Sequence, residues 1–363
     1  MTKDGSFKKV VRRHAQENGQ LYTEALTDLE GVEGRLAWRR WTDDGRSDAL
    51  HEPIARRLLV HLRDHYGVDA VAATKVSHHN DHVFRVERGD GGPWVARVFP
   101  PARPRAGAEG DAAILRFLER QHYPAEGLAV DEAASVFDGL SVLVTQFVTG
   151  GQLGTARGPT DTERFTIMGD LLGRLHALPL DESVSRPGGA SGEDPTREGS
   201  PRQDVLAALS FLDVAEAKVA ATGRKAFEPL RTRVRSADDG HGLPQALVHG
   251  NLLHAHDHVI VSERGPVAIQ WKASGRGPRL ADFAYLMWGT RNNAAWIDAA
   301  VRAYCQHVEL TDDELERLEG VMYVRPMYLA CFGYGSGRQP GRGEDWWEHI
   351  SATAAAVRDA CRR

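Results

Sequence analysis

The sequence predicts an α+β protein with two lobes, a small lobe rich in strands and a larger, mostly helical lobe. Valine-rich segments of alternating polarity are concentrated before Gly150, whereas the three- and four-residue spacing of helices dominates after it. With 363 residues, 42% of them hydrophobic, the chain is long enough to bury two cores. We therefore divide it into an N-terminal extension of residues 1–50, a small lobe of residues 51–149 and a helical lobe of residues 150–363.

The small lobe is predicted to combine helices with a hairpin and a further strand. The segment Pro53–Gly67 has helical spacing, with proline near its start and glycine at its end. Residues 82–99 alternate around a Gly-Asp-Gly-Gly turn, which is typical of a β-hairpin. A second helix is expected over Ala108–Gln121, and a buried strand over Leu140–Val148. The glycines that follow this strand indicate a hinge.

The helical lobe begins with an amphipathic helix over Glu163–Pro179, which the proline ends. Two short strands are expected on either side of the turn Ser262–Pro266. A last helix is expected from about Trp346 to Arg363.

The composition excludes several classes of protein. A net charge of -5 argues against a nucleic-acid partner, and no apolar run approaches the ~20 residues that a membrane span requires. The chain starts with a polar segment that lacks a signal-peptide core. Cys305, Cys331 and Cys361 show no paired spacing and are interpreted as reduced thiols. We therefore expect a cytoplasmic protein that binds neither nucleic acid nor a membrane.

The most informative segment is Leu247–Trp288. It contains His249-Gly250-Asn251, then His256 five residues later, then Ile269-Gln270-Trp271. This segment resembles the catalytic core of aminoglycoside phosphotransferases and choline kinases, whose pattern is His-Gly-Asp, an Asn five residues on, and a strand that ends in Ile-Asp-Trp. The resemblance covers roughly residues 60–300 and implies a two-lobed, protein-kinase-like fold.

The resemblance also implies roles for the positions that differ. In the family a carboxylate orients the attacking hydroxyl, and an Asn and an Asp hold magnesium. Asn251, His256 and Gln270 stand at these three positions, so the kinase motif is degenerate. A carboxamide cannot accept a proton at neutral pH, and a neutral amide and an imidazole are poor magnesium ligands. We therefore expect no cofactor and no competent kinase, although the loss of several catalytic groups is not additive.

The small lobe carries the positions that the family uses to hold nucleotide phosphates. Arg97 stands where the resemblance implies a phosphate-contacting lysine, and Glu109 is the implied partner on the neighbouring helix. Such a strand-to-helix pair is also a common purely structural arrangement. The phosphate-covering turn is expected at residues 77–82, which contain no glycine.

The segment is also rich in histidine. His249, His254 and His258, together with Asp257, are predicted to line the substrate cleft. The resemblance further implies that Asp282 braces the catalytic loop and that His249 bonds backbone. A strand would place His254, His256 and His258 on one face, an arrangement that suits zinc. Histidines in a polar loop are the more common reading, and we predict no metal site.

These observations favour a pseudokinase-type protein that binds a peptide or a small molecule in the cleft between the lobes. By resemblance, it could be a partner or cyclase-like component of lanthipeptide-type natural-product biosynthesis, or a repurposed enzyme of another kind. The alternative is an active phosphotransferase that uses Mg-ATP on an antibiotic or another hydroxylated small molecule. This alternative requires a carboxylate within reach of the metal, from Asp257 or from elsewhere in the cleft. A third possibility is a scaffold that binds a protein partner through its terminal extensions.

Overall fold

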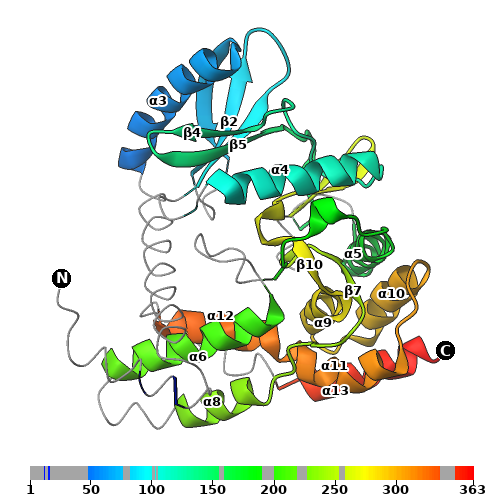
Figure 1. Cartoon of the computed structure of the whole chain (residues 1–363). Helices are drawn as coiled ribbons and strands as arrows, with labels where there is room; N and C mark the ends of the chain where they lie inside the picture. The colour runs from blue at the N-terminus through cyan, green and yellow to red at the C-terminus, as the bar shows by residue number, and fades with distance from the viewer. Residues whose placement is uncertain are drawn as a thin grey trace.

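The computed structural model describes residues 48–76, 82–99, 103, 105–154, 159–189, 200–218, 227–252, 258–335 and 348–363, with three isolated residues near the N-terminus. Figure 1 shows the small lobe, a twisted sheet with two helices, above the larger helical lobe. The mixed α+β architecture predicted from the sequence is confirmed. No helix among the described residues is long and apolar enough to cross a membrane.

The small lobe is a five-stranded antiparallel sheet flanked by two helices. Its strands lie in the order β1-β2-β3-β5-β4. The elements are α3 (Asp48–Tyr66), β1 (Ala70–Lys75), β2 (His82–Arg88), β3 (Trp94–Val98), α4 (Arg105–Arg120), β4 (Ala134–Phe137) and β5 (Leu140–Gln146). The predicted hairpin and final strand are present. The first helix begins five residues before the predicted Pro53 and ends at Tyr66, just before Gly67, whose positive φ of 67° suits glycine.

The larger lobe contains the remaining helices and two small sheets. The sheets pair β10 with β7 and place β8 between β6 and β9. Their strands are β6 (Gly151–Gln152), β7 (Gln245–Val248), β8 (Val259–Ser262), β9 (Gly265–Ala268) and β10 (Gly275–Pro278). The helices are α5 (Asp161–His176), η1 (Glu182–Val184), α6 (Pro201–Lys218), α8 (Phe227–Arg235), η4 (Trp271–Ala273), α9 (Arg279–Gly289), α10 (Ala294–Cys305), α11 (Asp312–Met322), α12 (Val324–Gly335) and α13 (Ile350–Cys361).

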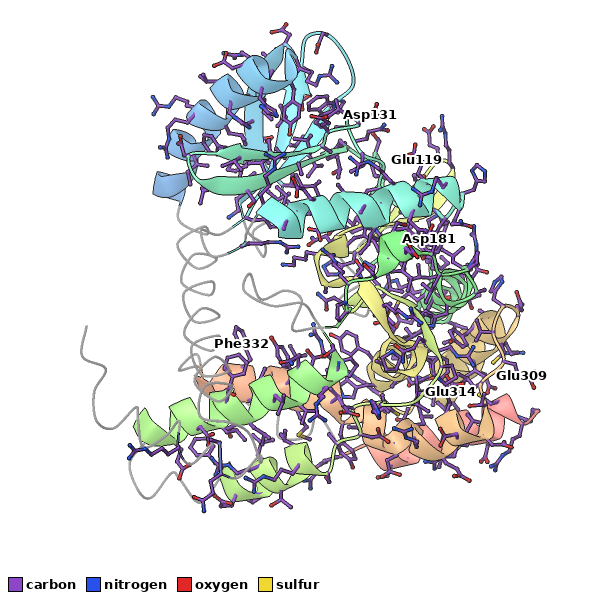
Figure 2. The ribbon with its side chains drawn as sticks, viewed as in Figure 1. Glu119, Asp131, Asp181, Glu309, Glu314 and Phe332 are labelled. Carbon is purple, nitrogen blue, oxygen red and sulfur yellow. The ribbon has the colours of Figure 1, made fainter. Side chains whose placement is uncertain are left out.

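Two hydrophobic cores hold these elements. The main core runs from the small lobe through α5, α9 and α10 to α13, and a second core joins α6, α8 and α12. A partly buried ion pair braces the main core, because Arg279 of α9 donates to both carboxylate oxygens of the buried Glu314 at 2.8 and 2.7 Å. Figure 2 labels Glu314 where α11 packs against α9. The predicted strands on either side of Ser262–Pro266 are β8 and β9, and the last helix begins at Ile350.

A buried carboxylate on α4 joins the two lobes. Asp111, on the buried face of α4, accepts hydrogen bonds from Arg103 at 2.8 Å and from Arg186 at 2.6 Å. Arg186 follows η1 in the larger lobe, and its Nε also donates to the carbonyl of Ser274 at 2.9 Å. Figure 1 shows α4 along the edge of the small lobe that faces the helical lobe. Asp111 therefore fixes the position of one lobe against the other.

We expect Asp111→Ala to lower the free energy of unfolding by about 3–5 kcal/mol, because it leaves the buried guanidinium group of Arg103 and the partly buried one of Arg186 without their carboxylate. Glu109→Ala is the matched control on the same helix, since the side chain of Glu109 is 51% exposed and pairs with the exposed Arg105. Its cost should stay below about 1 kcal/mol. Urea unfolding of both variants measures the difference, and equal costs would contradict the role of Asp111.

Candidate functional site

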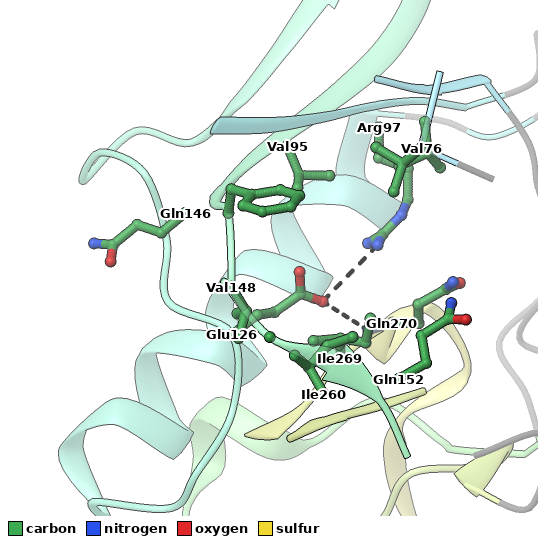
Figure 3. Close-up of a pocket in the computed structure, with 13 residues that line it drawn as sticks. Val76, Val95, Arg97, Glu126, Gln146, Val148, Gln152, Ile260, Ile269 and Gln270 are labelled. Carbon is green, nitrogen blue, oxygen red and sulfur yellow. Dashed lines mark hydrogen bonds and ion pairs between the residues drawn. The ribbon is translucent and has the colours of Figure 1, made fainter. Parts of the chain in front are cut away.

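A cavity of about 210 Å³ lies between the lobes, and residues of both lobes line it. Strands β2 and β3 contribute Val83 and Val95, and the segment after β5 contributes Phe147 and Val148. The larger lobe contributes apolar and amide side chains from β6, β8 and the segment after β9, shown in Figure 3. The complete lining is Val76, Val83, Val95, Arg97, Glu126, Gln146, Phe147, Val148, Gly150, Gln152, Ile260, Ile269 and Gln270. The cavity is thus apolar on most sides, with a cation, a carboxylate and three glutamines.

The carboxylate among the residues that line this cavity belongs to Glu126. Its Oε1 accepts the backbone N–H of Gln270 at 2.7 Å and lies 3.9 Å from Nη2 of Arg97. Its Oε2 accepts the hydroxyl of Thr145, on β5, at 2.9 Å. Figure 3 shows the Glu126 carboxylate between Arg97 above and Gln270 below. Only 4% of Glu126 is exposed, and its three contacts come from both lobes.

This arrangement corrects the expected Arg97–Glu109 pair. Glu109 lies on the solvent-facing side of α4 and bonds Arg105 instead, at 2.7 Å. Sequence reasoning missed Glu126 because it lies in the aperiodic segment between α4 and β4. The backbone N–H of Glu126 donates to the carbonyl of Ala268 at 3.0 Å, which fixes this segment against the end of β9.

Gln270 stands where β9 gives way to the short helix η4. Its backbone is left-handed, with φ 71° and ψ 60°, which is uncommon for a residue other than glycine. The hydrogen bond from its N–H to Glu126 supports this conformation. The side chain of Gln270 lines the cavity, where it presents a neutral amide. The structure therefore brings the predicted residues Gln270 and Arg97 into one cavity.

The loop His249–Asn251 is held by backbone hydrogen bonds. Asp282, in the first turn of α9, accepts the N–H groups of His249 at 2.5 Å and of Gly250 at 2.9 Å, which confirms its expected bracing role. The Nε2 of His249 donates to the carbonyl of Ile269 at 3.1 Å. Gly250 has a φ of 76°, and a Cβ there would lie 2.6 Å from a backbone oxygen. These contacts fix the backbone of the loop, and none of them involves the side chain of Asn251.

His249 was also predicted to line the substrate cleft, and this prediction is wrong. Its side chain is completely buried beside Trp271, with 4.6 Å between the ring centroids. The residue that lines a cavity at this loop is its neighbour Gly250.

The side chain of Asn251 is held by a cation. Its Oδ1 accepts a hydrogen bond of 2.8 Å from Nη2 of Arg325, on α12. Both side chains are buried, and the guanidinium group lies over the rings of Tyr285 and Tyr328, 5.1 and 5.4 Å from their centroids. An amide oxygen that accepts a hydrogen bond from a guanidinium group cannot take up a proton from a substrate hydroxyl. Sequence reasoning did not identify Arg325, which lies far along the chain from Asn251.

A second, smaller cavity of about 30 Å³ lies beside this pair. It is lined by parts of α6, α9 and α12 and by the loop at Gly250, and Arg325 contributes to its wall. A space of this size holds little more than a water molecule. It does not form an open site for a large substrate.

His258 is the histidine that the structure brings against Asn251. It immediately precedes β8, and its Nδ1 donates to the backbone carbonyl of Asn251 at 3.0 Å. His254, His256 and Asp257 lie outside the described residues, so their predicted roles stay predictions. Within the part of the chain that the structure describes, no group of three or more His, Cys, Asp or Glu side chains is placed to hold a metal ion.

Comparison with known proteins places this geometry in a family. Residues 73–320 match the phosphotransferase enzyme family, which is more than half of the chain and includes both sides of the cavity. The chain belongs to this family. The phosphotransferase-like fold that the sequence predicted is therefore confirmed.

Solved structures share the fold at low sequence identity. A spectinomycin phosphotransferase in complex with ADP and spectinomycin is 14% identical, with a TM-score of 0.57, and covers 84% of this chain and 98% of its own. An amicoumacin kinase in complex with AMP-PNP, Ca²⁺ and Ami is 12% identical, with a TM-score of 0.57, over 87% of this chain and 95% of its own. The choline kinase LicA from Streptococcus pneumoniae is 11% identical, with a TM-score of 0.55, over 84% and 99%. No curated protein matches the sequence significantly.

We expect Asn251→Leu to lower the free energy of unfolding by about 1–3 kcal/mol, because it removes the acceptor of a buried guanidinium N–H. Asn251→Asp keeps the shape and adds a charge opposite Arg325, so it should cost less than the leucine variant. Urea unfolding of both proteins makes the comparison. A more destabilising aspartate would show that Arg325 does not hold this position.

We expect Glu126→Ala to destabilise this phosphotransferase-family protein by on the order of 3 kcal/mol, because Arg97 and the backbone of Gln270 lose their common acceptor. Thr145→Val removes one neutral donor to the same carboxylate and should cost about 1 kcal/mol. Both values come from chemical unfolding. Similar small costs for the two variants would mean that Glu126 does not join the lobes.

Proposed function

We propose that this member of the phosphotransferase family is a pseudokinase-type protein, which binds a small molecule or a peptide in its cleft without magnesium-dependent phosphoryl transfer. The observation that carries the proposal is the hydrogen bond between Asn251 and Arg325. The family resemblance assigns the base of the reaction to position 251. In this chain a carboxamide occupies the position, and its oxygen already accepts a guanidinium N–H.

The metal-binding positions support the same proposal. Magnesium prefers oxygen ligands with negative charge in an octahedral arrangement. Gln270 offers a neutral amide at the cavity, and position 256 carries a histidine where the resemblance implies an asparagine. Among the residues that line the cavity, Glu126 supplies a carboxylate, and both of its oxygens accept hydrogen bonds from the protein. Magnesium would have to compete with these contacts.

The form of the cavity indicates the kind of ligand. A volume of about 210 Å³ is below the ~300–1,000 Å³ typical of pockets for drug-sized ligands. It suits one ring system or one large side chain between Val83 and Val95 on one side and Ile260 and Ile269 on the other. Gln146, Gln152 and Gln270 supply neutral amides at its edge. A peptide that inserts one aromatic side chain meets these requirements, as a partner or cyclase-like component of lanthipeptide-type biosynthesis would need.

The second candidate function is an active ATP-dependent phosphotransferase. The specific observation in its favour is the Glu126 carboxylate, which lines the same cavity as Gln270. If this carboxylate leaves the Gln270 N–H and Arg97, it can serve as a metal ligand. The similar spectinomycin phosphotransferase binds ADP and spectinomycin, and the amicoumacin kinase binds AMP-PNP and calcium. A nucleotide and a hydroxylated antibiotic are therefore the ligands to test for this candidate.

Titration calorimetry of the full chain with ATP, with and without magnesium, separates the two candidates. For a pseudokinase-type protein we expect the same result in both conditions, because no anionic ligand set is available for the metal. The reverted protein with Asn251→Asp, His256→Asn and Gln270→Asp should gain a dependence on magnesium. In this protein, magnesium should raise the affinity for ATP about tenfold or more, which is about 1.4 kcal/mol.

The matched control is Gln152→Asp, which adds a carboxylate to the same cavity at another position. It should leave binding independent of magnesium. Tight magnesium-dependent binding of ATP by the native chain would overturn the pseudokinase proposal. If Glu126→Gln then abolished that dependence, the active phosphotransferase would be the correct function, with Glu126 as its metal ligand.

A further inference from the structure

Arg97 is a buried cation in the wall of the cavity between the lobes. It lies on β3, its side chain is 5% exposed, and Figure 3 shows its guanidinium group directed toward Glu126. Its Nη2 lies 3.9 Å from Oε1 of Glu126, which is longer than the ~2.7–2.9 Å of a charge-assisted hydrogen bond. Its Nε is fully buried and has no hydrogen-bond partner among the described residues. The described part of the protein therefore leaves part of the donor capacity of this cation unused.

Another buried arginine shows what such a cation can bind. Nη2 of Arg231 donates to Asp213 at 2.8 Å and to Glu216 at 2.9 Å, so one guanidinium group pairs with two carboxylates at close range. A guanidinium group has five N–H donors, and a buried donor that lacks an acceptor costs free energy. Arg97 has the carboxylate of Glu126 at longer range. A second anionic acceptor, supplied by a ligand, would satisfy Arg97 as the second carboxylate does at Arg231.

The rest of the cavity wall suits a flat apolar group. Val83 and Val95 lie on the small-lobe side, and Ile260 and Ile269 lie on the side of the larger lobe. An engineered apolar cavity of about 150 Å³ accommodates benzene. A cavity of about 210 Å³ therefore holds one aromatic ring and a small substituent. Because Arg97 lines the same cavity, this substituent and the cation can meet there.

We propose that the cavity binds an aromatic ring that carries one carboxylate. The ring lies between the aliphatic side chains of the two lobes, and the carboxylate accepts hydrogen bonds from the guanidinium group of Arg97. This inference rests on the proposed function, because it assigns a class of ligand to the same cleft. Arg97 is then the residue that selects acids over neutral ligands, whereas the apolar walls contribute affinity to both.

The charge of Glu126 favours a carboxylate over a phosphate. The Glu126 carboxylate lies beside Arg97, so a ligand anion enters a site that already holds one negative charge. Repulsion between like charges grows with the charge of the ligand and is stronger where water is excluded. A carboxylate brings one negative charge, whereas a phosphate monoester brings about 1.5–2 at pH 7. The pair of Arg97 and Glu126 therefore disfavours the more highly charged group.

Two kinds of molecule carry this chemistry. One is a free aromatic acid, and the other is a peptide whose C-terminal residue is aromatic. Benzoate represents the first, and N-acetylphenylalanine represents the second. Benzamide and N-acetylphenylalaninamide are their neutral counterparts, in which an amide replaces the carboxylate. The ratio of affinities within each pair therefore measures the contribution of the charged group.

The test is titration of the native full chain with each of these four compounds, without nucleotide, followed by ligand-observed NMR. We expect the acid of at least one pair to bind about tenfold or more tightly than its amide, because a charge-assisted hydrogen bond replaces a neutral one. The pair with the tighter acid identifies the source of the ligand. Phenyl phosphate, measured in the same way, should bind no more tightly than benzoate.

Variants at position 97 assign the preference to the guanidinium group. Arg97→Met should abolish the preference for the acid while the amide still binds, and Arg97→Lys, which keeps a cation beside Glu126, should retain a preference. The matched control is Arg85→Met on the neighbouring strand β2. Arg85 lies over the ring of Phe147, 4.5 Å from its centroid, but is outside the lining of the cavity. This control should therefore prefer the acid as the native chain does.

Equal affinities of acid and amide in both pairs would overturn the proposal. So would the absence of binding by all four compounds, tighter binding of phenyl phosphate than of benzoate, or a preference that persists in Arg97→Met. Failure of the proposed function has a separate readout, which is magnesium-dependent binding of ATP to the native chain. Amides that bind as well as the acids, with ATP binding still independent of magnesium, would remove the role of Arg97 and leave the cleft a ligand site.

Discussion

The position of the two lobes on either side of the cleft depends on the contacts of the buried Glu126 carboxylate. It accepts the N–H of Gln270 from the larger lobe and the hydroxyl of Thr145 from the small lobe, and it lies beside the cation of Arg97. A buried carboxylate is tolerated only where such donors surround it. Separation of the lobes at this point would therefore break the hydrogen bond from the Gln270 N–H to this carboxylate. Asp111 on α4 applies a similar constraint, through Arg103 and Arg186.

The loop that carries the family's catalytic motif is fixed by contacts that do not involve the reacting positions. Asp282 holds the backbone of His249 and Gly250, and His249 in turn holds the carbonyl of Ile269. The side chain at position 251 takes no part in these bonds. A substitution there can change the chemistry of the site while the loop keeps its conformation. This separation explains how a family member can keep the fold with a carboxamide at that position.

Local sequence patterns predicted most of the fold, because strands and helices follow from the alternation and spacing of apolar residues. The hairpin of β2 and β3 and the helix α4 were predicted from such patterns. The partners of buried charges were not predictable in the same way. Glu109 had the expected helix but lies on its exposed side, whereas Glu126 lies in a segment without periodicity. Arg325 likewise reaches Asn251 only when α12 packs against a loop that is distant in the chain.

The pairing of Asn251 with Arg325 also limits what a single reversion can restore. An aspartate at position 251 would face a guanidinium group at hydrogen-bonding distance, in a site from which water is largely excluded. An opposite charge at that distance favours the ionised carboxylate and lowers its affinity for a proton. Such an aspartate would be a weaker base than one that faces the substrate alone. Phosphoryl transfer in this scaffold therefore depends on the position of α12 as well as on the residues of the loop.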